Sequence, residues 1–318
     1  MQPDSARELK ARILDGLPAV ASAVAGTEAP WPRVAVGLAP VGGGRARVAV
    51  RLQRNADRAL LPDLSSAAAA AVDVRVIGRV RPLSSPTPAE LQRRARPLRP
   101  GLSVAHPTVT AGTLGGFVRT PGGLAMLSNN HVLAAGDAAT LGDPSLQPGP
   151  ADGGFSGDRV ATLTAFQRFR SGEPNLFDAA IALIDEGVDA VPGDVPGGAL
   201  TGDVPHGLDV DPDEPVEKVG RTTGHTRGRI TAVEVDAVAV QYDDQVHRFD
   251  DQIEIQGLSG PFSAGGDSGS VIWRSRDRAP TALLFAGSAT GGSQGGGVTF
   301  ASPLESVLRA FSAQWVAH

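Results

Sequence analysis

Short apolar runs separated by turn residues dominate the chain from Thr108 to Leu308. The runs are a few residues long and are bounded by glycine, proline or aspartate, which is typical of β-strands in a barrel or sandwich rather than of βαβ units. Strands are expected at 113–118 and 123–127, and the segment 216–224 is expected to open a second barrel. A closing helix is expected at 302–311, where Ser302 would be the cap and Pro303 an early helical residue. The pattern predicts a mainly β domain.

The N-terminal part follows a different pattern. From Ser5 to Ala25 the apolar residues recur at helical spacing, which predicts an amphipathic helix that Pro18 ends or bends. Alternating runs at 33–38 and 45–52 predict two strands, joined by a hairpin turn at 42–44. A short helix at 64–71 and a strand at 72–77 complete the series. We therefore expect a small α+β module over residues 1–81.

Residues 82–101 combine several prolines with several arginines, a composition that marks a linker or an extended crossing segment. Its arginines would lie in solvent, bind an acidic partner or offer a cleavage site, and the solvated linker is the plainest of these interpretations. The mainly β domain then occupies 102–318.

Composition narrows the class of protein. Hydrophobic residues make up 41% of the chain and aromatic residues 4%, so alanine, valine and leucine must fill the core. The net charge is −5, which gives no global attraction to nucleic acid or to an anionic membrane. There is no cysteine, which suits a reducing compartment. The polar N-terminus lacks the pattern of a signal peptide, and no apolar run is long enough to span a membrane. We expect a cytoplasmic protein.

Three polar residues stand beside three apolar runs. Ser268 lies in the glycine-rich stretch 265–269, just before an apolar run. On its own this stretch is equally typical of an ordinary turn between strands. However, His131 follows the strand expected at 123–127, and Asp178 precedes the apolar run at 179–184. The order His, Asp, Ser along the chain is the order of the catalytic triad in chymotrypsin.

These segments resemble the three boxes of the chymotrypsin-fold (trypsin-like) serine peptidases: Ser-Asn-Asn-His-Val-Leu around His131, Phe-Asp-Ala-Ala-Ile-Ala around Asp178, and Gly-Gly-Asp-Ser-Gly-Ser around Ser268. The boxes lie 47 and 90 residues apart, which leaves room for two β-barrels that contribute to one cleft. The resemblance covers about residues 102–311 and is nearest to a cysteine-free bacterial group that is similar to the plant narrow-leaf proteins. It implies a two-barrel chymotrypsin-like peptidase domain.

The resemblance also assigns roles to residues. Ser268 would be the nucleophile, His131 the general base and acid, and Asp178 the partner that orients the imidazole, while the N–H groups of Gly266 and Ser268 would form the oxyanion hole. Asp267 would shape the oxyanion loop, with its partner left open. The chain departs from many members at Ser270, where they have glycine.

Substrate specificity follows from the same resemblance. The primary pocket would be walled by residues before the nucleophile and by a second apolar run: Phe262, Ser263, Ala264, Phe285, Ala286 and Gly287. No acid stands where trypsin selects arginine or lysine, so a pocket for small or apolar side chains is expected.

The remaining polar residues point to no further chemistry. The five histidines outside the boxes have no partners at ligand spacing and are interpreted as surface or packing residues: His106, His206, His225, His247 and His318. The acidic run at 209–214 is interrupted by proline and lacks the register of an EF-hand. We expect no metal and no cofactor.

The sequence therefore predicts a serine endopeptidase that acts on protein or peptide substrates. The alternative is a latent module of the same fold that binds a protein or peptide partner, with the N-terminal module as the candidate site for a regulatory partner. An esterase of the α/β-hydrolase type is opposed by the order of the triad and by Ser270, where that fold needs glycine.

Overall fold

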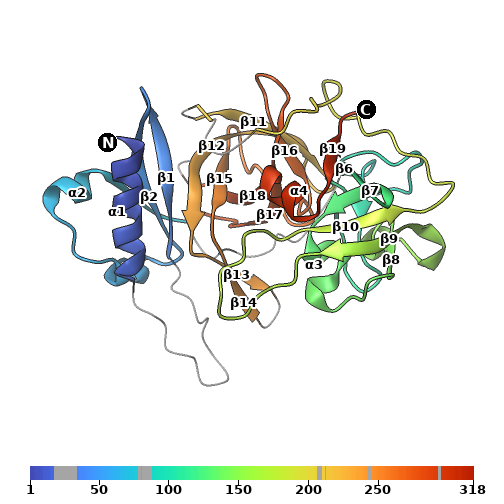
Figure 1. The fold of residues 1–318 in the computed structure, drawn as a ribbon, viewed down its shortest axis with the longest axis horizontal. Coiled ribbons are helices and arrows are strands. Elements are labelled where there is room, and N and C mark those ends of the chain that lie inside the picture. The colour runs from blue at the N-terminus through green and yellow to red at the C-terminus, as the bar shows by residue number, and fades with distance from the viewer. Residues whose placement is uncertain are drawn as a thin grey trace.

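The computed structural model describes residues 1–17, 34–77, 80, 88–205, 210–211, 213–242, 245–292 and 295–318. Most of its regular elements are antiparallel strands, arranged as two sheets that lie side by side with the N-terminal elements at one end (Figure 1). The prediction of a mainly β fold is confirmed. Among the described residues, no helix has the length and apolar character needed to cross a membrane.

The first barrel is a six-stranded sheet with the order β19-β6-β7-β10-β9-β8. Its strands are short and largely buried on the inner side: β6 (Gly116–Thr120), β7 (Gly123–Ser128), β8 (Pro144–Leu146), β9 (Arg159–Phe166), β10 (Ala180–Ile184) and β19 (Gln314–Val316). The two-residue strands β4 (Ser103–Val104) and β5 (Gly112–Thr113) pair with each other beside it. The C-terminal strand β19 pairs with β6, so the end of the chain completes the barrel.

The second barrel is a ring that closes because β11 pairs with both β16 and β12. The members of the ring are β11 (Pro215–Gly220), β12 (Gly224–Asp236), β15 (Gln252–Gly257), β16 (Val271–Arg274), β17 (Pro280–Gly287) and β18 (Thr299–Pro303). A hairpin of β13 (Val238–Tyr242) and β14 (Gln245–Phe249) leaves the ring between β12 and β15. The predicted two-barrel architecture is thereby confirmed.

The N-terminal module extends the sheet of the second barrel. Its elements are α1 (Pro3–Asp15), β1 (Val34–Gly42), β2 (Arg45–Leu52), α2 (Ser66–Ala70) and β3 (Val72–Val76). β1 pairs with the end of β12, so β1, β2 and β3 lengthen the barrel sheet to nine strands. The helix expected from Ser5 to Ala25 begins at Pro3 and ends at Asp15, and the part from residue 18 lies outside the described residues.

A buried ion pair joins this module to the barrel. Arg51 of β2 donates from Nε to Glu254 Oε2 of β15 at 2.6 Å, and both side chains are fully buried. Arg51 also donates to Asp73 of β3 at 3.1 Å. The burial of both charges requires this pairing, because a lone charge in an apolar interior is strongly disfavoured.

The described part of the proline- and arginine-rich segment, residues 88–101, packs on the first barrel. Leu91 and Leu98 are buried in its core. Arg94 pairs with Asp158 at 2.9 Å, and Arg96 donates to the side chain of Gln147. This part is an extended crossing segment, held by apolar burial and by its arginines.

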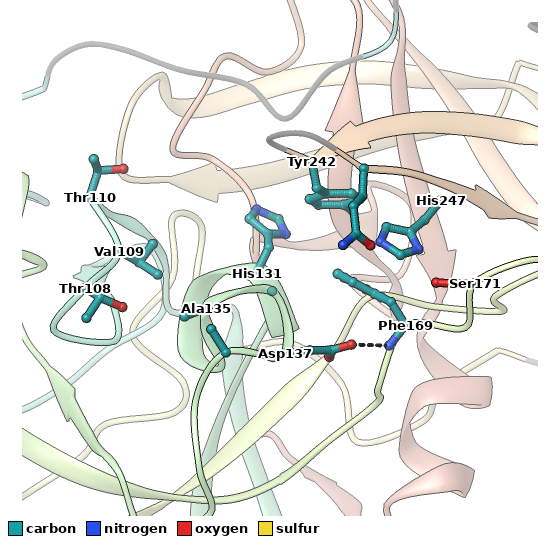
Figure 2. Close-up of a pocket in the computed structure, with 13 residues that line it drawn as sticks. Thr108, Val109, Thr110, His131, Ala135, Asp137, Phe169, Ser171, Tyr242 and His247 are labelled. Atoms are coloured by element: carbon teal, nitrogen blue, oxygen red, sulfur yellow. Dashed lines mark hydrogen bonds between the residues drawn. The ribbon is translucent and has the colours of Figure 1, made fainter. Parts of the chain in front are cut away.

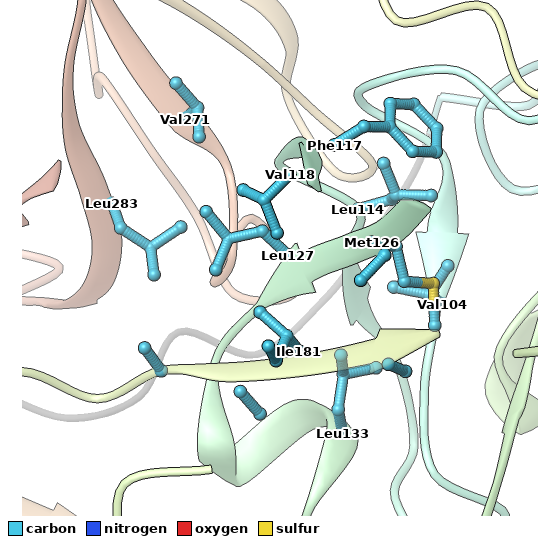
Figure 3. Close-up of a cluster of buried hydrophobic side chains, with 14 of the residues drawn as sticks. Val104, Leu114, Phe117, Val118, Met126, Leu127, Leu133, Ile181, Val271 and Leu283 are labelled. Atoms are coloured by element: carbon cyan, nitrogen blue, oxygen red, sulfur yellow. The ribbon is translucent and has the colours of Figure 1, made fainter. Parts of the chain in front are cut away.

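A shared apolar cluster joins the two barrels. Phe117 and Leu127 of the first barrel belong to the same cluster as Val271 and Leu283 of the second (Figure 3). Val271 follows Ser268 by three residues, so this packing also anchors the turn that carries the candidate nucleophile.

The closing helix is α4 (Leu304–Ala310), and it packs against β17 and β18. Its predicted serine cap is wrong. Pro303 occupies the cap position, with no side-chain cap, and Ser302 belongs to β18. The Ser302 hydroxyl donates to Gln252 Oε1 at 2.8 Å instead, because it lies inside the sheet rather than at the helix end.

Candidate active site

His131 and Asp178 come together where two neighbouring strands of the first barrel meet. His131 lies in the one-turn helix α3 (Asn130–Leu133), just after β7, and Asp178 lies just before β10, which pairs with β7. The Asp178 carboxylate accepts from the backbone N–H of Asn130 at 2.7 Å through Oδ1. Its Oδ2 lies 2.5 Å from His131 Nδ1. A carboxylate at this distance requires a proton on Nδ1, which leaves Nε2 as the free base.

Tyr242 is a further partner of this pair that sequence reasoning missed. Its hydroxyl donates to Asp178 Oδ2 at 2.8 Å. Burial and the nearby charge of Asp178 raise the pKa of Tyr242 well above its ordinary value, so the phenol stays a proton donor. The sequence contained one hint, because Tyr242 is the only tyrosine of the chain, but its strand pattern indicated no contact with Asp178.

Ser268 lies on a tight turn at the boundary of the two barrels. Gly266 and Gly269 on either side have φ angles of 84° and 95°, which favour glycine. Thr113 of the first barrel donates its N–H to the Ser268 carbonyl at 2.8 Å. The Ser268 side chain is 2% exposed, and its hydroxyl donates to the Phe285 carbonyl at 3.4 Å. Among the described residues, no hydrogen bond joins this hydroxyl to the His131 ring.

The peptide before Gly266 is held in one orientation. The Thr222 hydroxyl donates to the Gly265 carbonyl at 2.5 Å, and the Thr113 hydroxyl donates to the Gly266 carbonyl at 2.8 Å. The N–H and C=O of a trans peptide point in opposite directions. The N–H of Gly266 therefore points away from the Thr222 hydroxyl.

Asp267 has an internal cationic partner, which the sequence left open. Its carboxylate lies 3.2 Å from Lys218 Nζ, and both side chains are fully buried. It also accepts from the N–H groups of Thr222 and Ala264, each at 2.9 Å, and from the Thr223 hydroxyl at 2.6 Å. Burial lowers the pKa of Lys218, while the charge of Asp267 opposes that effect. Lys218 thus supplies the positive charge that stabilises Asp267 in the turn, and no charge from a chain terminus is needed.

A cavity of about 690 Å³ opens beside His131 (Figure 2). The aromatic rings of Phe169, Tyr242 and His247 form one wall, with ring centroids of Phe169 4.8 Å from His247 and 5.0 Å from Tyr242. The Nδ1 atom of His247 is buried and has no hydrogen-bond partner in the part of the chain that the structure describes, and burial lowers the pKa of this imidazole. The sequence did not predict this cavity.

The residues predicted to wall the primary pocket are mostly buried. Phe285 packs its ring on Phe249 at 4.7 Å, and Ser263 meets the Thr299 hydroxyl at 2.7 Å. Ala264 is partly exposed, whereas the other five are buried: Phe262, Ser263, Phe285, Ala286 and Gly287. None of the six lines the cavity beside His131. Their role in specificity stays a prediction.

Two of the remaining histidines have acidic partners. His106 lies 3.2 Å from Asp143, and His225 lies 2.5 Å from Glu217. His206 lies outside the described residues. In the ranges that the structure describes, no group of three or more His, Asp or Glu side chains is arranged to hold a metal ion.

Comparisons with known proteins bear on the fold alone. No protein-family model and no curated protein matches the chain. The solved structures that are similar include Thermobifida fusca protease A, with 18% identity and a TM-score of 0.48, matched over 70% of this chain and 100% of that one. A glutamic acid specific serine protease is 18% identical, with a TM-score of 0.49 and coverage of 69% and 100%. Cellulomonas bogoriensis chymotrypsin is 18% identical, with a TM-score of 0.47 and coverage of 70% and 100%.

Proposed function

We propose that the protein is a serine endopeptidase in which Ser268 attacks the carbonyl carbon of a peptide bond. The observation that carries the proposal is the His131–Asp178 pair. Asp178 is fully buried and fixes Nδ1 of the imidazole at 2.5 Å, which directs the basic Nε2 outward. A buried carboxylate in this position holds the tautomer and stabilises the imidazolium that forms when His131 takes a proton.

In the proposed reaction, His131 Nε2 accepts the Ser268 proton while Oγ bonds to the carbonyl carbon. The tetrahedral oxyanion is stabilised by the N–H groups of Gly266 and Ser268. Collapse breaks the peptide C–N bond, the amine leaves with the proton from His131, and an acyl-enzyme remains. His131 then takes a proton from water while the water oxygen bonds to the acyl carbon. Collapse of this second tetrahedral intermediate breaks the bond to Ser268 Oγ, which takes the proton back from His131, and the acid product leaves.

The Ser268 hydroxyl must rotate before this chemistry can start. It donates to the Phe285 carbonyl at 3.4 Å, near the long limit for such a bond, so little energy opposes rotation about the Cα–Cβ bond. Catalytic hydrogen bonds are often long or absent without substrate and form in the complex. The orientation of Gly265 and the bracing of Asp267 support an oxyanion hole that is assembled before substrate binds.

Covalent labelling of the full-length chain by a fluorophosphonate tests the proposal. We expect modification at Ser268, located by peptide mass spectrometry, and its loss in both Ser268→Ala and His131→Gln. Hydrolysis of a peptide library by the unmodified chain should be lost in the same variants. A chain that folds but neither labels nor hydrolyses would refute the proposal.

A latent peptidase-fold module that binds a peptide partner is the second candidate. It is favoured by the state of Ser268, which is 2% exposed and hydrogen-bonded to Phe285 rather than to His131. In this case peptides would bind without hydrolysis, and Ser268→Ala would bind them as tightly as the unmodified chain. Fluorescence anisotropy with library peptides separates the two functions.

A further inference from the structure

Asp178 is shared between donors from two parts of the fold. His131 Nδ1 and the Tyr242 hydroxyl both meet Oδ2, at 2.5 and 2.8 Å. Oδ1 accepts instead from the backbone N–H groups of Asn130 at 2.7 Å and His131 at 3.3 Å. The backbone therefore fixes one oxygen within the first barrel. The other oxygen, Oδ2, also accepts a hydrogen bond from Tyr242, which belongs to the hairpin between β12 and β15.

The hairpin is tied firmly to the loop that carries Asp178. Asn175 donates its N–H to the Arg248 carbonyl at 2.8 Å, and the N–H of Asp250 donates to the Asn175 carbonyl at 2.9 Å. The Tyr242 ring lies beside those of Phe169 and His131 (Figure 2). Its centroid is 5.0 Å from that of Phe169 and 5.4 Å from that of His131. The phenol thus approaches Asp178 from a fixed direction.

The buried Tyr242 hydroxyl requires a hydrogen-bond acceptor, and Asp178 provides it. The residue is 9% exposed and packs in an apolar cluster with Val240 and Phe249. A buried phenol without an acceptor would be costly. A phenylalanine would satisfy the packing equally well, so the hydroxyl is the part of this side chain that packing does not explain.

We propose that Tyr242 is a positioning residue of the candidate active site, whose hydroxyl fixes the Asp178 carboxylate and withdraws part of the negative charge that Oδ2 offers to His131. The inference rests on the proposed function, in which His131 is the base. An oxygen that serves two donors stabilises each of them less than it would stabilise one. Tyr242 would therefore lower the proton affinity of His131 and keep Nε2 available as a base at lower pH.

Removing the hydroxyl should have the opposite effect. In Tyr242→Phe, Oδ2 would serve His131 alone, and the imidazolium would gain stability. Among the described residues, two other ionisable groups lie near the pair and are unchanged in this variant. They are His247, with its ring centroid 6.0 Å from that of Tyr242, and Asp137, whose carboxylate accepts from the side chain of Asn130 and from the N–H of Phe169.

Nitrogen-15 NMR titration of the full-length chain tests the proposal without relying on turnover. The six histidines give separate imidazole signals, and those of His131 are identified by their loss in His131→Gln. We expect the pKa of His131 to rise by about half to one unit in Tyr242→Phe. The acid limb of the fluorophosphonate labelling rate should move upward by the same amount. The signals of His247, followed in the same titration, show whether its own protonation accompanies the change.

Val240→Ala supplies the matched control. Val240 is fully buried in the same strand, two residues from Tyr242, so its truncation should lower the melting temperature and leave the His131 titration unchanged. An unchanged His131 pKa in Tyr242→Phe would overturn the proposal, as would an equal shift in Val240→Ala. A shifted pKa in a protein that never labels at Ser268 would support the role of Tyr242 and reject the peptidase function.

Discussion

Replacing Lys218 with methionine should destabilise the fold and disturb the turn that carries Ser268. Lys218 Nζ lies 3.2 Å from Asp267 Oδ2, and neither side chain is exposed. Methionine fills a similar volume without the charge, so the variant leaves the Asp267 carboxylate buried without its cation. Breaking a buried pair in this way costs about 3–5 kcal/mol.

The structure places the expected cost near the lower end of that range. Asp267 would keep the hydrogen bonds from the N–H groups of Thr222, Thr223 and Ala264 and from the Thr223 hydroxyl. A loss of about 3 kcal/mol corresponds to a fall in melting temperature of roughly 6–12 °C, at about 2–4 °C per kcal/mol for a large domain. If the turn shifts enough to remove the Gly266 donor, labelling of Ser268 should slow by about 100- to 1,000-fold.

Thermal and urea denaturation followed by circular dichroism measure the first effect, and the fluorophosphonate rate measures the second. The double variant Lys218→Met with Asp267→Asn removes both charges and should recover at least about 1 kcal/mol relative to Lys218→Met. Recovery will be incomplete, because an amide nitrogen cannot accept the hydrogen bond from Ala264. Additive effects of the two substitutions would refute the reasoning, since they would mean that the charges are not coupled.

Three further predictions concern single sites. Partial burial and two carboxylates of β12 raise the pKa of Asp251 to about 6, so its contribution to stability is present below about pH 4 and is lost as the pH rises through 6. Asp251→Asn should therefore raise the free energy of unfolding at pH 8 and leave it unchanged near pH 4. The gain should be no more than about 1 kcal/mol, because the side chain is only partly buried and solvent screens its charge; a gain at both pH values would contradict this assignment. Gly269→Ala should lower the free energy of unfolding, measured by urea denaturation, by well over about 2 kcal/mol, because its φ is 95° and the new methyl group would collide with Ser128. Gly43→Ala is the control: its φ is 59° and the space around it is open, so it should cost about 1–2 kcal/mol. Equal losses would refute the steric argument. Thr222→Val should slow fluorophosphonate labelling by about tenfold or more with a small loss of stability, because the Thr222 hydroxyl orients the peptide between Gly265 and Gly266. An unchanged labelling rate would exclude that role.

The parts of the site that lie within short segments were predictable, whereas the contacts between distant segments were not. His131, Asp178 and Ser268 each stand beside an apolar run, so the local pattern placed them at strand ends. Lys218 and Tyr242 carry no such local signal. They meet Asp267 and Asp178 through contacts between residues 49 and 64 positions apart, which strand periodicity does not encode.

The N-terminal module illustrates the same limit for the fold. Strand periodicity predicted β2 at Arg45–Leu52, because alternation is a local property. The pairing of β1 with β12 depends instead on the edge of β12 that β11 leaves free beyond Arg229, and that edge is formed by residues far along the chain. The predicted cap of α4 was wrong for a related reason, because Ser302 lies in the sheet and its hydroxyl donates to Gln252 there.

The pairing of β1 with β12 also means that β1 is synthesised long before the strand with which it pairs. Val36 faces Asp236, so the partner strand lies 200 residues further along the chain. At about 5–20 residues per second, a ribosome needs roughly 10–40 s to produce it. During that interval one edge of β1 is unpaired, although β2 can already pair with its other edge and α1 can cover its apolar face. Slowing translation between the module and β12 should therefore lengthen the period in which a chaperone can bind the nascent chain.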